Sequence, residues 1–454
     1  KGLYPLAMPA VLGVEGAGIV EAVGDGVTQV AVGDRVGYAG IVGGYAEARL
    51  LPAWRAIKLP DDVSDALAAS SLLRACTAHM LLCKVHPVTP GTTILIHAGA
   101  GGLASIVIPW AKRLGARIKP LDASRALSDI AETALGAVLT HVAADFAETY
   151  GHVPGGDIAI VALGRLGSRE MSASSDLDLI FVYDAAPDAL ESDGPKPLAP
   201  GQYFGRLTQR TINAVTAMMA EGPLYEVDMR LRPSGTKGPL ATSLTAFRQY
   251  HDESAWTWER MALVRARVVA GTGDLRGRVE QAIAEILGEP VNPEKLLRDA
   301  ADMRARIAKE KVSDCIWDVK NLRGGLVDIA FIIQYLTLRH IGDHPDIRDP
   351  NTMDSLAKLR DARVLAPHHC ETMMRAQELW MGLLGILAET IEGTLTKDKE
   401  EQISRALAND LVRVAGAADF DGLKRMMIET AQAVFDIFRE LVDEPAADLP
   451  PALE

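Results

Sequence analysis

The chain has 454 residues, of which 48% are hydrophobic and 24% are charged, and its formal net charge is 47 − 60 = −13. This apolar content excludes a disordered or fibrous protein, and the length leaves room for two to four domains of roughly 100–200 residues each. The negative charge argues against broad contact with nucleic acid or with an anionic membrane. No stretch approaches the roughly 18 uninterrupted apolar residues of a membrane span and no secretory signal is seen, so we expect a cytoplasmic globular protein with free thiols.

The N-terminal quarter combines short strand patterns with a glycine-rich turn. Residues 1–60 are rich in Gly and Val, and alternating runs such as AGIVEAVG predict short strands joined by glycine turns. Residues 64–86 have helical spacing, and the apolar strand pattern TTILIHA then leads through a glycine cluster into a further helix. The cluster consists of Gly99, Gly101 and Gly102. This order is the start of a nucleotide-binding α/β unit, and the pattern changes near residue 119.

The middle of the chain alternates strands with helices, whereas the last part is helical throughout. From residue 157, DIAIVALG and SDLDLIFVYD predict two strands separated by the glycine turn GRLGSRE, and YEVDMRLRP predicts a further strand. After about residue 274 almost every segment has helical periodicity, up to about Val442. The proline-containing tail that follows is expected to be flexible.

Two aspartates in SSDLDLIFVYD are the most informative residues of the chain. On a strand, Asp176 and Asp178 point to the same face about 6–7 Å apart, while Leu177 and Leu179 face the core. Two adjacent carboxylates repel, so their pKa values rise unless a cation lies between them, and Mg²⁺ readily shares carboxylate ligands with phosphate groups. The alternative is a solvated strand end, which is the more common meaning of an isolated D-x-D.

The segments on either side of this pair favour a phosphate site. Upstream, Gly164, Gly167 and Ser168 form a small-residue turn after a hydrophobic strand, where backbone N–H groups and a hydroxyl can approach a triphosphate. Downstream, YEVDMRLRPSG places four polar residues on one strand face: Glu226, Asp228, Arg230 and Arg232. A third carboxylate with two guanidinium groups suits a site that holds metal ions and phosphate oxygens, and the alternative is a surface salt-bridge ladder.

Several long motifs give a resemblance to a known family. ALGRLGSREMSASSDLDLIFVYD, LYEVDMRLRPSG, AWTWERMALVRARVV and WDVKNLRGGLVDIAFIIQYLTLRH, spread over about residues 120–445, resemble the glutamine-synthetase adenylyltransferase family. The motifs YEVDMRLRPSG and ESAWTWER resemble those of the C-terminal, adenylylating half of these enzymes, which consist of two halves. The resemblance implies transfer of AMP from ATP to a tyrosine of glutamine synthetase, with Mg²⁺ as the metal and a PII-type signal protein as a further partner.

The same resemblance implies roles for individual residues. Asp176, Asp178 and Asp228 would be the catalytic, metal-binding carboxylates. The residues that would line the ATP phosphates are Gly167, Ser168, Arg230 and Arg232. One metal ion would lower the pKa of the target tyrosine, near 10 when free, and a second would neutralise the leaving pyrophosphate, with Asp228 helping to remove the proton.

Other positions are interpreted as structural or as departures from the family. The lone histidines His152 and His251 are taken as structural residues. In the helical motif Ala330 replaces the acidic residue that the family usually has, although Lys320 and Asp328 remain.

Residues 1–118 carry a second resemblance, to the quinone oxidoreductases of the medium-chain dehydrogenase/reductase superfamily. It rests on LGVEGAGIVEAVGDGV, VGDRVGYAG and PGTTILIHAGAGGLASIVIPWAKRLGA. Val14 stands where zinc-dependent relatives have a histidine, and Ala104 stands where the cofactor turn usually has its last glycine. Dinucleotide binding needs a full doubly wound sheet, but this segment stops after one strand–helix unit. We therefore expect a truncated fusion partner without NADPH-dependent activity, in which Gly99, Gly101 and Gly102 are a vestigial dinucleotide turn.

The expected fold is a multidomain α+β protein. A polymerase-β-like nucleotidyltransferase core is followed by an α-helical bundle domain and preceded by a partial β-rich, Rossmann-like fragment. The expected boundaries are 1–118 for the fragment, 119–273 for the nucleotidyltransferase domain, 274–445 for the helical domain and 446–454 for the tail. Two other functions stay open, an NADPH-dependent quinone oxidoreductase and a catalytically silent interaction module.

Overall fold

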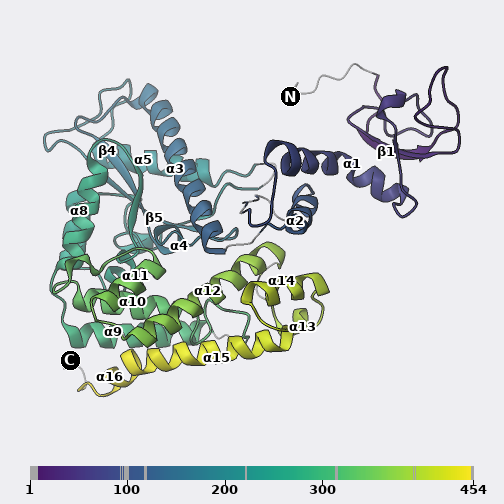
Figure 1. Ribbon diagram of the computed structural model, residues 1–454. Helices are drawn as coiled ribbons and strands as arrows, with labels where there is room; N and C mark the ends of the chain where they lie inside the picture. The colour runs from purple at the N-terminus through teal and green to yellow at the C-terminus, as the bar shows by residue number, and fades with distance from the viewer. Residues whose placement is uncertain are drawn as a thin grey trace. The chain divides into compact units, whose positions relative to one another are not determined.

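The computed structural model describes residues 9–92, 94, 96, 102–116, 120–219, 222–311, 315–391, 393 and 395–450, with only the backbone described at Pro120, Glu389 and Lys397. The chain divides into two compact units, Lys1–Ile118 and Lys119–Glu454. Figure 1 shows the helices and strands of both units. Within the described residues, each unit has its own hydrophobic core.

The first unit contains a small antiparallel sheet and helices. Its strands, in sheet order, are β1 (Glu15–Ile19), β2 (Arg35–Ala39) and β3 (Ile57–Lys58). Its helical segments are η1 (Ala53–Arg55), α1 (Asp65–His79), the π-helical η2 (Met80–Val85) and α2 (Ala104–Arg113). Helix α1 begins after Ser64, whose hydroxyl accepts a hydrogen bond from the Leu67 N–H at 3.2 Å and so caps the first turn.

The second unit is built around a mixed sheet with strand order β6-β5-β4-β8, in which β7 also pairs with β5. The strands are β4 (Asp157–Ala162), β5 (Leu177–Asp184), β6 (Val227–Asp228), β7 (Ala241–Ser243) and β8 (Arg267–Gly271). β4 is antiparallel to β5 and β8, whereas β6 and β7 are parallel to β5. The central strands β4 and β5 are almost wholly buried, so both of their faces are covered.

Alternation along the central strands divides the core of this unit in two. Ile158, Ile160 and Ala162 of β4 belong to a core with α3 (Pro120–Tyr150) and α5 (Pro200–Val215). The intervening Ala159 and Val161 belong to a second core with α6 (Leu244–Glu253), α7 (Thr257–Leu263) and α8 (Leu275–Gly288). This period of two is the pattern of a strand buried on both faces.

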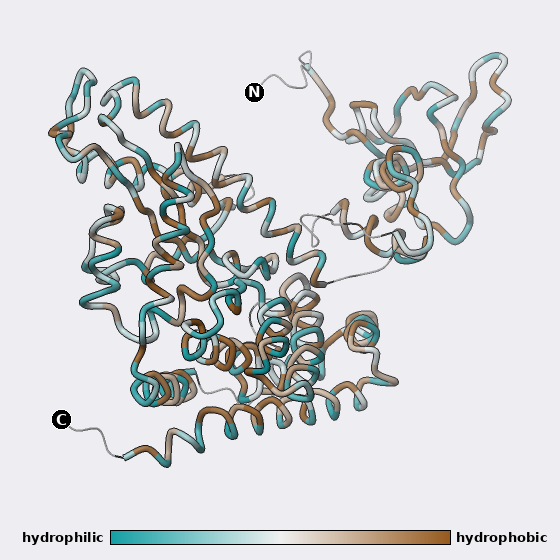
Figure 2. Tube along the Cα trace, turned by 60° about the vertical axis from the view of Figure 1, so that its left-hand side comes forward, coloured by the Kyte–Doolittle hydropathy of each residue, from teal (hydrophilic) through white to brown (hydrophobic). Residues whose placement is uncertain are grey.

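The second core continues into the helical part of the unit. Its helices are α9 (Pro293–Glu310), α10 (Leu326–His340), α11 (Thr352–Asp361), α12 (Pro367–Thr390), α13 (Lys397–Glu400), α14 (Arg405–Ala415), α15 (Phe420–Phe438), the π-helical η5 (Arg439–Asp443) and α16 (Glu444–Ala447). Short helical turns complete the unit: α4 (Gly164–Gly167), η3 (Gly235–Lys237) and η4 (Pro345–Ile347). Along α15, hydrophobic and hydrophilic positions alternate with the helical repeat (Figure 2), because one side packs into the core.

Two helical stretches among the described residues have the length and hydropathy of a membrane span, Asp65–Val85 and Leu121–Tyr150. Both contain charged residues, such as Arg74 and Asp129. The second stretch lies in α3, whose buried residues Ala131, Leu135, Leu139 and Phe146 belong to the core beneath the sheet. This packing is typical of a core helix in a globular domain.

Candidate functional site

The three predicted carboxylates lie at the start of β5 and on its neighbour β6. Asp178 and Asp228 are Cα partners in the parallel β5–β6 register, and paired strands are about 4.8 Å apart. Asp176 lies one residue before β5 and is exposed. Ile180 and Val182 follow Asp178 at intervals of two and belong to the core on the helical side of the sheet. The strand periodicity therefore brings the acidic face of β5 toward the side of the sheet that carries the helical part.

The carboxylates of Asp178 and Asp228 differ in their electrostatic surroundings. Burial is the largest cause that raises the pKa of Asp178, and together with the negative charges of Asp176 and Asp228, and against the opposing effects of Lys320 and Arg230, it brings that pKa to about 6. The pKa of Asp228 is lowered instead, because Arg230 donates to its carboxylate from Nε at 2.7 Å and from the backbone N–H at 2.8 Å. This lowered pKa keeps Asp228 ionised at neutral pH and makes its carboxylate a weak proton acceptor.

The fit of this donor set to a divalent cation is partial. Among the residues that the structure describes, no three His, Cys, Asp or Glu side chains are grouped as a ready metal-ligand set. Asp228 is instead paired with Arg230, whose side chain is 79% exposed. All the candidate ligand atoms are nevertheless carboxylate oxygens, which Mg²⁺ prefers. The pKa of Asp178 is raised first by burial and then by the neighbouring carboxylates, and a bound cation would offset the repulsion among these carboxylates.

The turn after β4 reaches the carboxylates through Gly164. This residue has φ +52°, and a Cβ placed on it would lie 1.9 Å from Oδ2 of Asp178. Only glycine satisfies both the backbone conformation and this close approach. The sequence placed Gly164 in the turn but did not single it out as a site residue.

Gly167 and Ser168, which were expected to line phosphates, are packed inside the protein. A Cβ on Gly167 would lie 2.2 Å from the carbonyl oxygen of Arg265. The Ser168 hydroxyl is buried and donates to Oε2 of Glu170 at 3.0 Å. Gly164 is thus the residue of this turn that lies against the Asp178 carboxylate, and phosphate contacts of Gly167 and Ser168 stay a prediction.

The expected polar face of YEVDMRLRP is only partly formed. Strand β6 comprises two residues, so the alternation does not extend to Arg232, and the prediction of a longer strand is wrong. The Arg232 side chain is buried and donates to the backbone carbonyls of Met229, Thr236, Gly238 and Pro239. It therefore holds the turn after β6 together, and its contact with phosphate stays a prediction. Arg230 does lie at the site, bound to Asp228.

Two cationic residues at the site were not singled out for this role from the sequence. Arg165 follows Gly164, and its guanidinium interacts electrostatically with Asp176 and with Arg265. Lys320 comes from the segment between α9 and α10, and it interacts electrostatically with Asp176, Asp178 and Arg165. Both belong to the quoted motifs GRLGSRE and WDVKNLRGG, but periodicity alone does not show that these segments meet.

Two further predictions concern the glycine turn of the N-terminal unit and His251. Gly99 and Gly101 lie outside the described residues, and a Cβ on Gly102 would lie 2.3 Å from the Arg74 side chain. His251 is buried with no hydrogen-bond partner for either ring nitrogen among the described residues, and burial lowers its pKa to about 4. It is therefore neutral and packed between aromatic rings, as expected of a structural histidine.

Carboxylates on paired strands thus lie beside a glycine turn and two cationic side chains, an arrangement that could hold divalent metal ions and phosphate oxygens. Two family models match the chain. Residues 106–282 match the model described as "Glutamate-ammonia ligase adenylyltransferase", and residues 295–442 match "GlnD PII-uridylyltransferase".

Two relatives make the resemblance specific. A Rhodopseudomonas palustris (strain TIE-1) protein is 42% identical over 341 residues, covering 75% of this chain and 34% of the relative. A Mesorhizobium japonicum protein is 42% identical over 322 residues, covering 71% of this chain and 32% of the relative. Both are named "Bifunctional glutamine synthetase adenylyltransferase/adenylyl-removing enzyme". The resemblance indicated by the motifs is confirmed, and the chain spans about a third of the length of these relatives.

The N-terminal unit matches a different family. Residues 1–61 match the model described as "Alcohol dehydrogenase GroES-like domain". Similar solved structures include a quinone oxidoreductase of Pseudomonas syringae, with 50% identity, a TM-score of 0.25, and coverage of 26% of this chain and 36% of that chain. A quinone oxidoreductase of Escherichia coli complexed with NADPH has 43% identity, a TM-score of 0.25 and the same coverage.

Proposed function

We propose that residues 119–445 transfer AMP from ATP to a tyrosine of glutamine synthetase. The observation that carries the proposal is the β5–β6 register, which pairs Asp178 with Asp228 beside Gly164. The family matches over residues 106–282 and 295–442 and the names of the relatives support the choice of reaction and of protein substrate. A PII-type signal protein is proposed as a further partner, and the cytoplasm as the location.

The carboxylates would hold the metal and the turn would leave room for the nucleotide. Asp176, Asp178 and Asp228 would provide oxygen ligands for Mg²⁺, which when bound neutralises phosphate charge and favours ionisation of the attacking hydroxyl. Gly164 leaves the Asp178 carboxylate uncovered because it has no side chain. Arg230 keeps Asp228 ionised through its hydrogen bonds, which suits a ligand better than a general base.

We also propose the finer architecture of the chain. Residues 119–273 would form a polymerase-β-like core, residues 274–445 its helical bundle domain, and residues 446–454 a flexible tail. Residues 1–118 would be a truncated oxidoreductase-like segment that transfers no hydride. This proposal rests on the sequence pattern, in which one strand–helix unit precedes the change near residue 119, whereas dinucleotide binding requires a doubly wound sheet. NADPH consumption with a quinone acceptor above background would refute this last point.

The reaction is tested by incubating the whole chain with labelled ATP, Mg²⁺ and glutamine synthetase. We expect label on a tyrosine of the synthetase, and its absence would overturn the proposal. Asp178→Asn should abolish transfer without lowering the thermal melt, because the substitution preserves shape and removes a partly buried charge that is also a ligand charge. The matched control is Asp188→Asn, an exposed loop residue, which should transfer at the rate of the unmodified chain.

A further inference from the structure

A hollow of about 390 Å³, separate from the candidate carboxylates, collects three arginines. It is lined by Arg125 of α3, Gly167 and Arg169 at the end of α4, Arg267 of β8, residues 349–351 and Asp354 of α11. Its volume lies within the range of about 300–1,000 Å³ that is typical of small-molecule sites. Three guanidinium groups thus meet at one place in a chain whose net charge is −13, and we call this place the arginine hollow.

Arg267 is fixed in the wall of the arginine hollow by the sheet part. Its Nε donates to the carbonyl of Gly167 at 2.8 Å, and its Nη2 donates to the carbonyl of Leu166 at 3.1 Å and to Glu132. These contacts use two of its three nitrogen atoms and hold the guanidinium plane in one orientation.

The other two arginines keep unused donors. Arg169 donates to Asp129 from Nη2, while its Nε is buried without a hydrogen-bond partner among the described residues. Arg169 also has φ +58°, and backbone strain of this kind concentrates at ligand and active sites. Arg125 forms an ion pair with Asp354 at 3.7 Å, which is longer than a hydrogen bond.

The acceptors of the opposite wall are already engaged. The Asp349 carboxylate accepts from the backbone N–H of Asn351 at 3.0 Å and pairs with Lys358 at 3.1 Å. The Asn351 side-chain oxygen accepts from the backbone N–H of Met353 at 3.1 Å. The arginine hollow therefore offers donors in excess, and guanidinium donors pair best with carboxylate or phosphate oxygens.

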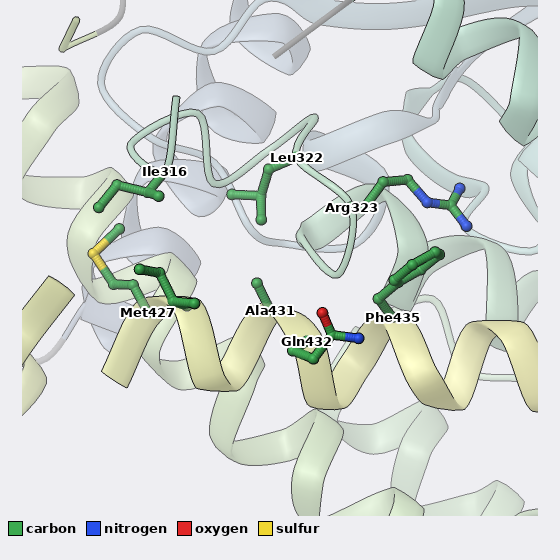
Figure 3. Close-up of a pocket in the computed structure, with 8 residues that line it drawn as sticks. Ile316, Leu322, Arg323, Met427, Ala431, Gln432 and Phe435 are labelled. Carbon is green, nitrogen blue, oxygen red and sulfur yellow. The ribbon is translucent and has the colours of Figure 1, made fainter. Parts of the chain in front are cut away.

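A second hollow of similar size shows that this gathering of cations is specific. Figure 3 shows Leu322 and Arg323 facing Ala431 and Phe435 of α15 around a hollow of about 340 Å³. The Arg323 guanidinium lies 4.5 Å from the centre of the Phe435 ring and pairs with Asp443 at 3.0 Å. Its lining is mainly apolar and its cation is already paired, so it suits an anion less well than the arginine hollow does.

The α11 side of the arginine hollow is bonded to the end of the α4 turn. Asn351 Nδ2 donates to the carbonyl of Ser168 at 2.9 Å, and the backbone N–H of Thr352 donates to the buried Glu170 carboxylate at 3.3 Å. Gln377 of α12 adds a hydrogen bond from Nε2 to Glu170 at 3.1 Å. The helical part therefore holds this turn through direct hydrogen bonds.

The same turn contacts the candidate carboxylates. The backbone N–H of Ser168 donates to the carbonyl of Gly164 at 3.2 Å. Gly164 in turn lies against Asp178, since a Cβ placed on it would be 1.9 Å from Oδ2 of that residue. A ligand that joins α11 to the sheet part at the arginine hollow therefore favours one position of Gly164 beside Asp178.

We propose that the arginine hollow binds a small organic anion carrying carboxylate or phosphate groups, and that the bound anion raises the rate of AMP transfer. The anion would accept hydrogen bonds from Arg125 and Arg169 and would hold α11 against the turn. The binding site is independent of the proposed function, whereas the effect on the rate rests on it.

Binding is tested by isothermal titration of the whole chain with succinate and with glycerol 3-phosphate at fixed ionic strength, which separates carboxylate from phosphate recognition. Arg125→Met and Arg169→Met should each weaken binding about 10-fold, as expected for one lost charge-assisted hydrogen bond. Both side chains are at least 40% exposed, so the variants should fold, which a thermal melt verifies. The matched control is Arg375→Met, because the ion pair of the exposed Arg375 with Glu371 also measures 3.7 Å, and its affinity should be unchanged.

The rate is tested by transfer of labelled AMP to glutamine synthetase with and without saturating anion, at constant free Mg²⁺. We expect an increase of about fivefold, the low end of usual coupling between sites, which both arginine variants lose at the same anion concentration. Absence of saturable binding, equal affinity in the arginine variants, or displacement of the anion by ATP would overturn the site. Binding without a change in rate would overturn the effector role. A chain that transfers no AMP under either condition refutes the proposed function and with it the effector role, while the titration alone decides the site.

Discussion

Replacing Gly164 by alanine is the most direct test of the site geometry. The residue has φ +52°, a conformation that costs an L-residue roughly 1–2 kcal/mol, so unfolding free energy should fall by about that amount. The new Cβ would also lie 1.9 Å from Oδ2 of Asp178, and ordinary contact begins near 3.4 Å. The carboxylate must therefore move by about 3.4 − 1.9 = 1.5 Å.

A displacement of this size at a reacting centre is expected to lower the rate of AMP transfer about 100-fold. Transfer of labelled AMP and urea unfolding, measured on the same preparation, separate the two effects. Gly136→Ala is the matched control, because Gly136 lies inside α3 with open space around its Cα and should gain about 0.5–1 kcal/mol instead. A Gly164→Ala protein with normal transfer and normal unfolding would refute the proximity of this turn to Asp178.

Three further predictions concern buried charge. Because the pKa of Asp178 is raised to about 6 from 3.8, the folded state holds this proton more tightly than the unfolded state, so metal-free stability should fall as pH rises from about 4 to 6. Asp178→Asn should remove that slope in urea unfolding curves. The pKa of His251 is lowered to about 4 from 6.5, so the unfolded state binds its proton first and stability should fall as pH drops from about 6.5 to 4. His251→Phe should abolish this loss. Arg304→Met should cost up to about 3–5 kcal/mol because the buried Asp328 loses its closest cation and keeps only Arg323, at 3.4 Å, and the Gly324 N–H, and adding Asp328→Leu should recover part of the loss.

Each of these three predictions has an outcome that would contradict it. A stability profile of Asp178→Asn that matches the unmodified chain between pH 4 and 6 would show that this carboxyl is not the group responsible. Retention of the acid-side loss in His251→Phe would assign it to carboxylates instead. A double Arg304 and Asp328 variant no more stable than the single one would show that packing, rather than the unpaired charge, dominates the cost.

The placement of the acidic pair was predictable from sequence because it depends on local periodicity. Alternation in SSDLDLIFVYD puts Asp178 opposite Leu177 and Leu179, and the structure places those leucines in the core beneath α3 and α5. The sequence also identified Asp228 as the third carboxylate, and the register pairs it with Asp178.

Residues beyond Asp228 and those from distant segments were not predictable in this way. The pattern of YEVDMRLRP predicts a continuous strand, but Arg232 bonds to carbonyls up to Pro239, and Ser234 has φ +61°, so the chain turns after two residues of β6. A strand pattern does not reveal a side chain that satisfies the backbone of a later turn. Lys320 reaches the site only through the packing of α9 and α10 around Arg304, which no local pattern encodes.

Helices α11 and α12 hold Glu170 through hydrogen bonds from Thr352 and Gln377, and this limits where the chain can be shortened. A fragment ending near residue 274 would lack both Thr352 and Gln377 and would leave a negative carboxylate facing an emptied apolar surface. The turn that carries Gly164 would then lose this support, and its position would no longer be fixed. We therefore expect the sheet and the helices that hold Glu170 to be inherited together.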